Sequence, residues 1–317
     1  MVSPRVGPGP LAVLCGPTAT GKSAIAVPLA ERLGAEIVAA DSRTVYRGMD
    51  IGTAKPPPAL RVRVPHHLID VADPREIVTA AEFQRLARAA IDGIRRRGRL
   101  PLIVGGTGFY IRAVTDGCAF PPVPPDRDLR ARLEAEARTY GPVALHARLA
   151  ALDPASAAAI HPHNIRRVVR ALEIALHTGA PRPLVAPGDG APVVMVGLVM
   201  ERAALYRRIA ARVHAQLAAG LVDETRRLLA EGVPLDRPSM QGLGYKEIAS
   251  WLRGERGYDE AVRVLIRNTR QYAKRQLTWF RREPRLHWVD VTGAATDEVV
   301  ARVHGIMDRE LRAMKEA

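Results

Sequence analysis

The sequence LAVLCGPTATGKS, residues Leu11–Ser23, decides the fold of this chain. Its apolar start predicts a buried strand, Gly16–Ser23 matches G-x-x-x-x-G-K-[ST], and the residues from Ala24 to Leu33 have helical spacing. In this strand–loop–helix context the loop amides and the helix N-terminus favour anions. Lys22 adds a full positive charge, and the Ser23 hydroxyl is placed to ligate Mg²⁺. The stretch therefore predicts a polyphosphate site.

The composition favours a polyanionic partner. The 317 residues carry a formal net charge of +14, and 47% of them are hydrophobic, which is ample for a buried core. Without a membrane segment or a signal peptide pattern, this charge favours nucleic acid, with an arginine-rich surface that binds nothing as the alternative. The two cysteines, Cys15 and Cys118, form no metal or disulfide pattern and suit a reducing cytosol. We therefore expect a cytoplasmic protein without a membrane partner.

Two further apolar runs predict strands that end beside the phosphate loop. Glu36–Ala40 leads into Asp41, and ligands of open α/β sheets lie beyond the carboxyl ends of the strands. Asp41 is a metal ligand, a general base or a turn cap. Leu100–Val104 leads into Gly105–Thr107, where many P-loop NTPases carry an Asp that holds Mg²⁺. The sequence thus predicts polyphosphate binding without the usual hydrolysis apparatus.

Proline-rich breaks divide the chain. Phe120–Pro125 reads as a stiff hinge, and a second break follows Gly179. The residues between these breaks have helical patterns. We predict an α/β core with a parallel sheet, made of 1–120 and 191–317, and a mostly helical insertion over 121–190.

The segment Ala261–Arg282 is the most basic of the chain. Basic residues that alternate with aromatic ones suit phosphate contact and base stacking, so we favour RNA contact over a bland solvated helix. The residues concerned are Arg263, Arg267, Arg270, Lys274, Arg275, Arg281 and Arg282, with Tyr272, Trp279 and Phe280 between them.

Several motifs of the chain together resemble the tRNA dimethylallyltransferases, also called tRNA isopentenylpyrophosphate transferases. They are GPTATGKS (16–23), DSRTVYRGMDIGTAKP (41–56), VPHHLID (64–70), PLIVGGTGFYI (101–111), NIRRVVRALEI (164–174), GLGYKE (242–247) and RQYAKRQLTWFR (270–281). The resemblance implies a P-loop-kinase-like parallel sheet with a helical insertion domain and Mg²⁺ as cofactor. It also implies transfer of a dimethylallyl group from dimethylallyl diphosphate to the N6 amine of the adenosine 3′-adjacent to the anticodon in tRNA.

The resemblance also implies roles for single residues. Asp41 matches the family's general base, Arg212 matches the arginine at the donor diphosphate, and Lys22 is the third catalytic residue. The diphosphate cradle comprises Gly16, Pro17, Thr18, Ala19, Thr20, Gly21, Lys22 and Ser23, with Ser23 at the metal. The matched tRNA-binding positions are Asp41, Ser42, Arg43, Thr44, Thr107, Arg130, Arg166, Arg167, Arg170, Gly244, Tyr245, Lys246, Lys274, Arg275, Gln276, Trp279 and Arg281. Thr44 stands where many members carry Gln.

The residues support the same chemistry. Neutralising the diphosphate promotes ionisation of an allylic donor, and a carboxylate that accepts the amine proton makes the adenine amine a nucleophile. The adenine has to leave its stack, as in other base-modifying enzymes. A small-molecule kinase, a prenyltransferase for free adenylate and a plain RNA-binding module are the rival interpretations, and none of them needs all the motifs. We expect the anticodon stem-loop as partner and a monomeric protein.

Overall fold

The computed structural model describes residues 9–121, 123–179 and 191–316. The chain folds into two compact units. We call the described parts of 1–116 and 188–317 the core unit, and the described part of 117–187 the helical unit. The insertion was predicted over 121–190. Its expected end at 190 lies in the segment 180–190, outside the described residues.

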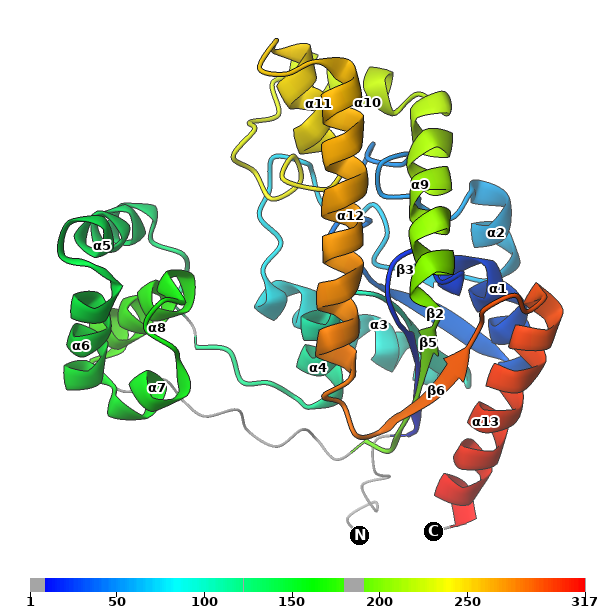
Figure 1. Ribbon diagram of the computed structural model, residues 1–317. Coiled ribbons are helices and arrows are strands. Elements are labelled where there is room, and N and C mark those ends of the chain that lie inside the picture. Colours follow the sequence, from blue (N-terminus) through cyan, green and yellow to red (C-terminus); the bar gives the residue numbers. More distant parts are fainter. Residues whose placement is uncertain (1–8, 122, 180–190, 317) are drawn as a thin grey trace, which may run out of the picture. The chain divides into compact units, whose positions relative to one another are not determined.

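The core unit is built on a parallel sheet, as predicted. Its six strands have the order β3-β2-β4-β1-β5-β6, and every pairing is parallel (Figure 1). The strands are β1 (Leu11–Cys15), β2 (Ala35–Ala40), β3 (His66–His67), β4 (Leu100–Gly105), β5 (Val193–Val199) and β6 (Leu286–Asp290). Because the strands are parallel, the segments after β1, β2 and β4 begin at the same edge of the sheet.

Nine helices accompany the sheet in the described part of the core unit. They are α1 (Lys22–Leu33), α2 (Pro58–Arg63), α3 (Ala80–Arg96), α4 (Gly108–Thr115), α9 (Arg202–Ala218), α10 (Leu221–Ala230), α11 (Tyr245–Leu252), α12 (Tyr258–Phe280) and α13 (Thr296–Glu316). The short elements α2 and β3 were not predicted, because six and two residues carry too little periodicity to be recognised.

Both faces of the sheet are covered, which explains the continuous apolar run of β1. Leu11, Val13 and Cys15 point to one face and pack with α3 and α4. Ala12 and Leu14 point to the other face and pack with α1 and α13. All five residues of β1 are buried, so the phosphate loop leaves the sheet from a rigid base.

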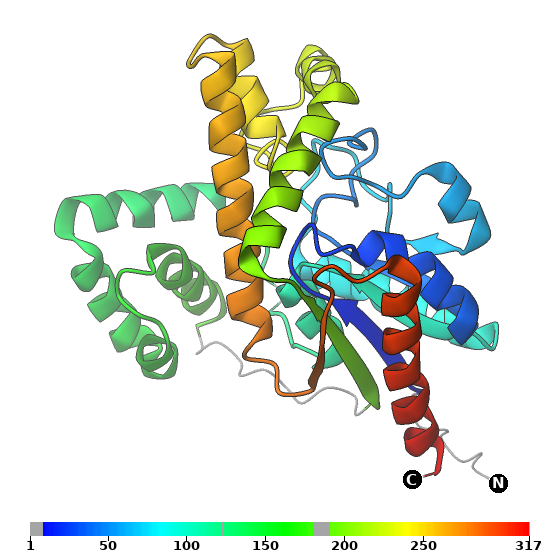
Figure 2. The ribbon, with the colours of Figure 1, turned by 45° about the vertical axis from the view of Figure 1, so that its right-hand side comes forward.

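A further apolar cluster, beside those on the two faces of the sheet, joins the segment after β2 to helices of the core unit that come later in the chain. Helices α9 and α12 lie side by side, with α10 and α11 at their far ends (Figures 1 and 2). Val45, Tyr46 and Met49 pack into this helical group, where Leu221 and Ile248 are among their partners. The core fixes the segment after Asp41 against helices that come much later in the chain.

The helical unit has a core of its own. Its helices are α5 (Arg127–Tyr140), α6 (Pro142–Leu152), α7 (Pro154–Ala159) and α8 (Ile165–Thr178). Leu133, Leu149 and Leu172 are among its buried residues. The fully buried Glu173 carboxylate accepts hydrogen bonds from the guanidinium groups of Arg130 and Arg170. This ion pair joins α5 to α8.

Candidate active site

The side chain of Lys22 folds back onto the backbone of the phosphate loop. Gly16 has a φ of +136°, and a Cβ there would lie 2.5 Å from the Leu198 carbonyl oxygen. Helix α1 begins at Lys22, whose Nζ donates to the carbonyl oxygens of Gly16 (2.8 Å) and Pro17 (2.6 Å). The Thr20 hydroxyl also donates to Pro17, at 2.9 Å. The loop is therefore compact before any ligand contact is considered, and only glycine fits its first position.

The loop after β4 approaches its neighbours too closely for side chains. A Cβ on Gly105 would lie 2.1 Å from the Ala40 carbonyl oxygen, and one on Gly106 would lie 2.3 Å from Gln276 Nε2. Gln276 is 7% exposed. Its Oε1 accepts from the Thr18 amide, and its Nε2 donates to the Gly106 carbonyl, both at 2.8 Å. Gln276 thus ties the two loops together.

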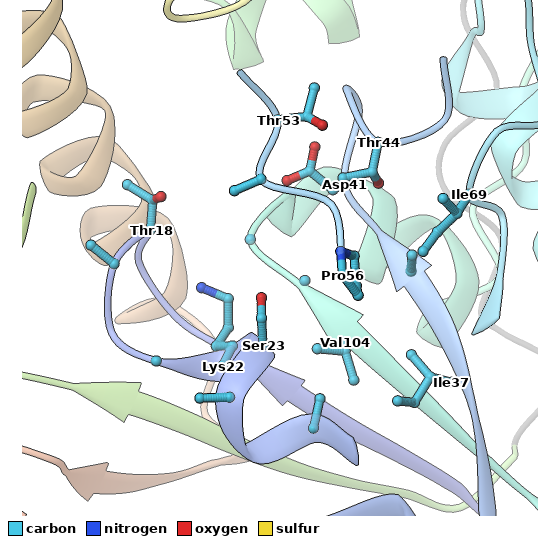
Figure 3. A pocket seen from close by; sticks show the side chains of 18 of the residues that line it. Thr18, Lys22, Ser23, Ile37, Asp41, Thr44, Thr53, Pro56, Ile69 and Val104 are labelled. Atoms are coloured by element: carbon cyan, nitrogen blue, oxygen red, sulfur yellow. The ribbon is translucent and has the colours of Figure 1, made fainter. Parts of the chain in front are cut away.

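A cavity of about 340 Å³ opens beside the phosphate loop. Lys22 and Ser23 lie on one side of it, and Ile37 and Val104 lie on another (Figure 3). Arg208 and Arg212 of α9 add positive charge to the loop side. The apolar part of the lining includes Ala26, Ile37, Ala39, Pro56, Ile69 and Val104. One cavity therefore offers both an anion site and an apolar wall.

A second cavity, of about 270 Å³, adjoins the first. The two share five lining residues: Thr18, Asp41, Thr53, Arg212 and Tyr272. The second cavity has a more polar lining, which includes Ser42, Arg43, Gln241, Lys246 and Arg275. Asp41 therefore stands where a ligand of the first cavity meets a ligand of the second.

Asp41 has a turn-capping contact as well as this position. Its Oδ1 accepts from the Arg43 amide at 2.8 Å. The neighbouring Ser42 amide donates to the Thr107 hydroxyl at 3.2 Å, and the Thr107 amide donates to the Ala40 carbonyl. These bonds fix the turn after β2 against the loop after β4. Asp41 is thus held rigidly at the edge of the sheet.

Burial and charge act together on the ionisable groups at this position. Burial, and after it the charge of the nearby Arg212 guanidinium, lower the pKa of Lys22 to about 8. Burial also lowers the pKa of Arg212, while the Asp41 charge opposes that shift. The pKa of Tyr272 is raised to about 12 by burial and by Asp41. Asp41 therefore faces two cationic side chains and a neutral phenol at neutral pH.

The predicted site residues fall into two groups in the core unit. The residues that line one or both cavities are Thr18, Ala19, Gly21, Lys22, Ser23, Asp41, Ser42, Arg43, Thr44, Arg212, Tyr245, Lys246, Arg275 and Gln276. Those outside both linings are Gly16, Pro17, Thr20, Thr107, Gly244, Lys274, Trp279 and Arg281. Thr44 lines the first cavity, and its buried hydroxyl has no hydrogen-bond partner among the described residues.

Three predicted tRNA positions have groups that are engaged inside the protein. Gln276 joins two loops, as described above. Tyr245 is 1% exposed, and its hydroxyl donates to Glu224 at 2.6 Å. Gly244 is buried, and its amide donates to Glu247 at 2.9 Å. Gln276 and Tyr245 nevertheless line the cavities, so these contacts shape the site, and the role of the three residues in tRNA binding stays a prediction.

Helix α12 does carry an exposed basic surface. Of the seven basic residues named above for the segment Ala261–Arg282, six are exposed: Arg263, Arg267, Lys274, Arg275, Arg281 and Arg282. Arg270 instead packs over the Tyr206 ring. The three aromatic residues among them differ: Trp279 is 39% exposed, Tyr272 lines the cavities, and Phe280 is buried and is not available for stacking on a base.

The predicted tRNA arginines of the helical unit also differ from one another. Arg166 and Arg167 are exposed at the start of α8. Arg130 and Arg170 are half-buried and bonded to Glu173, and Arg170 donates in addition to the Val123 carbonyl at 2.9 Å. These last two arginines therefore have a structural role inside the unit.

Sequence reasoning missed several lining residues. Arg208 lines the first cavity, and Tyr272 and Thr53 line both cavities. Tyr272 precedes Gln276 by four residues, and Arg208 precedes Arg212 by four. This spacing places each pair on one helix face, so it was a usable signal. Thr53 offered none, because its position depends on the fold of the loop.

The described residues lack a metal-binding cluster and a membrane-spanning helix. Outside the segments at 1–8, 122, 180–190 and 317, no three His, Cys, Asp or Glu residues cluster so that they could hold a metal ion. No helix within these same limits is long and apolar enough to cross a membrane.

Residues 44–283 match the family model for IPP transferase. The chain belongs to the IPP transferase family. A tRNA dimethylallyltransferase of Symbiobacterium thermophilum is 51% identical over 300 residues, which cover 92% of this chain and 94% of that protein. A relative of the same name from Thermomicrobium roseum is 51% identical over 286 residues, covering 89% of this chain and 87% of its own. The family predicted from the motifs is confirmed.

Solved structures agree with this assignment. The full-length tRNA isopentenylpyrophosphate transferase of Bacillus halodurans is 45% identical, with a TM-score of 0.74, and the match covers 96% of this chain and 98% of that one. A eukaryotic dimethylallyltransferase described as acting on tRNA is 26% identical, with the same TM-score, over 90% of this chain and 74% of its own. The predicted P-loop-kinase-like fold is confirmed.

Proposed function

We propose that this chain transfers a dimethylallyl group from dimethylallyl diphosphate to the N6 amine of the adenosine 3′-adjacent to the anticodon in tRNA, and releases diphosphate. The observation that carries the proposal is the pair of adjoining cavities with Asp41 in both linings. Family membership supports the same reaction class, since the curated relatives bear the name tRNA dimethylallyltransferase.

The first cavity suits the donor. Its loop side presents Lys22, Arg208 and Arg212 for a diphosphate, and its apolar lining matches a five-carbon hydrocarbon group. Fixed charges at the leaving group stabilise the negative charge that develops as the allylic carbon–oxygen bond breaks. These contacts lower the barrier most when they strengthen in the transition state.

The second cavity suits the adenine, which reaches it by leaving its stack in the anticodon loop. The N6 nitrogen attacks the allylic carbon, the bond from that carbon to the diphosphate oxygen breaks, and the N6 proton passes to the Asp41 carboxylate. Asp41 is the sole acidic residue that lines either cavity among the described residues. Its turn bond to Arg43 holds it in place without using both carboxylate oxygens.

The residues at the loop fit Mg²⁺ bound largely through the diphosphate. Ser23 lines the first cavity at the start of α1, where its hydroxyl is a suitable ligand. Mg²⁺ keeps several waters and needs few protein ligands when phosphate oxygens are present, so the lack of an acidic cluster in the described part of the chain agrees with this role. Bound there, Mg²⁺ would neutralise the leaving diphosphate.

The acceptor is an RNA and not free adenylate. The exposed cations of α12 and those at the start of α8 suit an extended phosphate backbone, which free adenylate lacks. Arg275 links the two features, because it is exposed on α12 and also lines the second cavity. We also propose that the protein acts as a monomer.

Mass analysis of nucleosides tests the proposal directly. The protein is incubated with unmodified tRNA, dimethylallyl diphosphate and Mg²⁺, and the tRNA is digested. We expect the mass of one dimethylallyl group on the adenosine beside the anticodon, and none on free adenylate supplied instead of tRNA. Modification of adenylate alone, or steady ATP hydrolysis that Lys22→Ala abolishes, would contradict the proposal.

A further inference from the structure

The turn Asp50–Pro56 contributes to the walls of both cavities. Thr53 lines both, Ala54 and Pro56 line the first, and Gly52 lines the second. The turn therefore lies where donor and acceptor meet in the proposed reaction, on which this inference rests. A displacement of the turn would change the shape of both cavities at once.

One buried carboxylate holds this turn from outside the cavities. Glu224 of α10 is 8% exposed and lines neither cavity. The amides of Asp50, Ile51 and Gly52 donate to its oxygens at 2.8, 2.9 and 3.1 Å. The Tyr245 hydroxyl donates to Oε1 at 2.6 Å. Four donors thus converge on one carboxylate, and such charge-assisted bonds are the stronger kind.

Contacts from other helices complete the support. Gln216 of α9 donates to the carbonyl oxygens of Ile51 (2.8 Å) and Gly52 (2.9 Å). A Cβ on Gly52 would lie 2.5 Å from the Tyr245 ring, so the backbone packs directly on the phenol. Ala54 has a φ of +51°, a conformation that persists only where surrounding contacts enforce it. The conformation of the turn therefore depends on α9, α10 and α11.

We propose that Glu224 is a positioning residue for the transfer reaction. By fixing the amides of the turn, it keeps Thr53 and Ala54 at the place where the allylic carbon has to face the adenine amine above Asp41. It touches neither substrate. Small displacements of reacting groups cost large factors in rate, so loss of this support lowers the transfer rate more than it lowers substrate affinity.

Glu224→Gln tests the proposal with the smallest change of shape. Glutamine offers one acceptor oxygen, and its NH₂ group meets backbone donors, so the turn loses part of its support. We expect the single-turnover transfer rate to fall roughly 10- to 100-fold with saturating donor and tRNA. We expect donor affinity to change less than the rate, and hydrogen exchange at residues 50–54 to become faster.

Glu36→Gln is the matched control. Glu36 is also a buried carboxylate with several donors, but it lies near the start of β2 and lines neither cavity. It should lose stability and keep the wild-type transfer rate. Gly52→Ala provides an independent variant, because it displaces the same turn from the Tyr245 side and leaves the Glu224 carboxylate intact. It should reproduce the loss of rate.

Two outcomes would overturn the role of Glu224. The first is faster exchange of the turn in Glu224→Gln or Gly52→Ala with transfer within about twofold of wild type, which lies below the cost expected from misplacement. The second is an equal loss of rate in Glu36→Gln. A wild-type protein that modifies no tRNA would refute the proposed function itself, whereas active wild type with equally active variants refutes only the positioning role.

Discussion

Replacing Asp41 by Asn separates the proton acceptor from the turn cap. The carboxylate makes one bond within the turn, in which Oδ1 accepts from the Arg43 amide at 2.8 Å. The amide oxygen of Asn can accept the same bond, so the turn after β2 should be retained. The variant removes the negative charge and the basic oxygen that face the two cavities. The substitution therefore tests the chemistry with little change in shape.

The size of the effect follows from the proposed role. A positioned general base contributes a factor of about 10² to 10⁴, which corresponds to a barrier increase of roughly 3 to 5 kcal/mol. The charge of Asp41 also raises the pKa of Lys22, which burial holds at about 8. Loss of that charge lowers the pKa of Lys22 further. The comparison therefore uses saturating donor, so that weaker donor binding does not by itself lower the measured rate.

Single-turnover transfer with saturating donor and tRNA measures the chemical step. Asp41→Asn and Asp41→Ser should both lose most of the rate, because each retains a capping group and neither is a base. Lys22→Ala should weaken donor binding as well as transfer, since Lys22 meets the diphosphate before and during the reaction. If Asp41→Asn kept more than about a tenth of the wild-type rate, Asp41 would be a turn cap or a metal ligand and not the base.

Three further predictions concern charge. Because the pKa of Lys22 is about 8, donor affinity measured by calorimetry should be highest below that pH and decline above it, and Lys22→Arg should lack the decline. A flat wild-type profile would contradict this. With about five phosphate contacts, tRNA affinity should fall with salt at a log–log slope near −4, whereas a slope near zero would exclude α12 as the RNA surface. Bonds from Arg97 and His67 hold the pKa of Glu36 at about 2. The resulting stabilisation is present at pH values above the unfolded-state pKa of about 4.5 and is lost as the pH falls towards 2. Glu36→Gln should therefore lower the free energy of unfolding in urea at pH 7 by roughly 1–3 kcal/mol. It should also make that free energy depend less on pH in the acid range. If the variant's unfolding free energy fell with acid as steeply as that of the wild type, this role of Glu36 would be refuted.

Local patterns in the sequence determined much of the fold. Gly16–Ser23 predicted the loop and the start of α1, because a helix N-terminus and its glycines are set by neighbouring backbone bonds. Helix α3 follows Thr79, whose hydroxyl accepts from the Glu82 amide as a local cap. Gly105 and Gly106 allow close backbone approach after β4. Hydrogen bonds and periodicity of this kind span a few residues, so the sequence displays them.

The tertiary structure alone decided which side chains face the site. Gln276 and Tyr272 belong to a helix whose composition predicted an RNA surface, yet one clamps two loops and the other lines both cavities. Glu224 is 172 to 174 residues from the amides that it holds. The orientation of a helix face depends on the partners that bury it, and these partners are distant in the chain. No local pattern encodes such a pairing, so the second cavity emerged only when α9, α11 and α12 packed over the turn after β2.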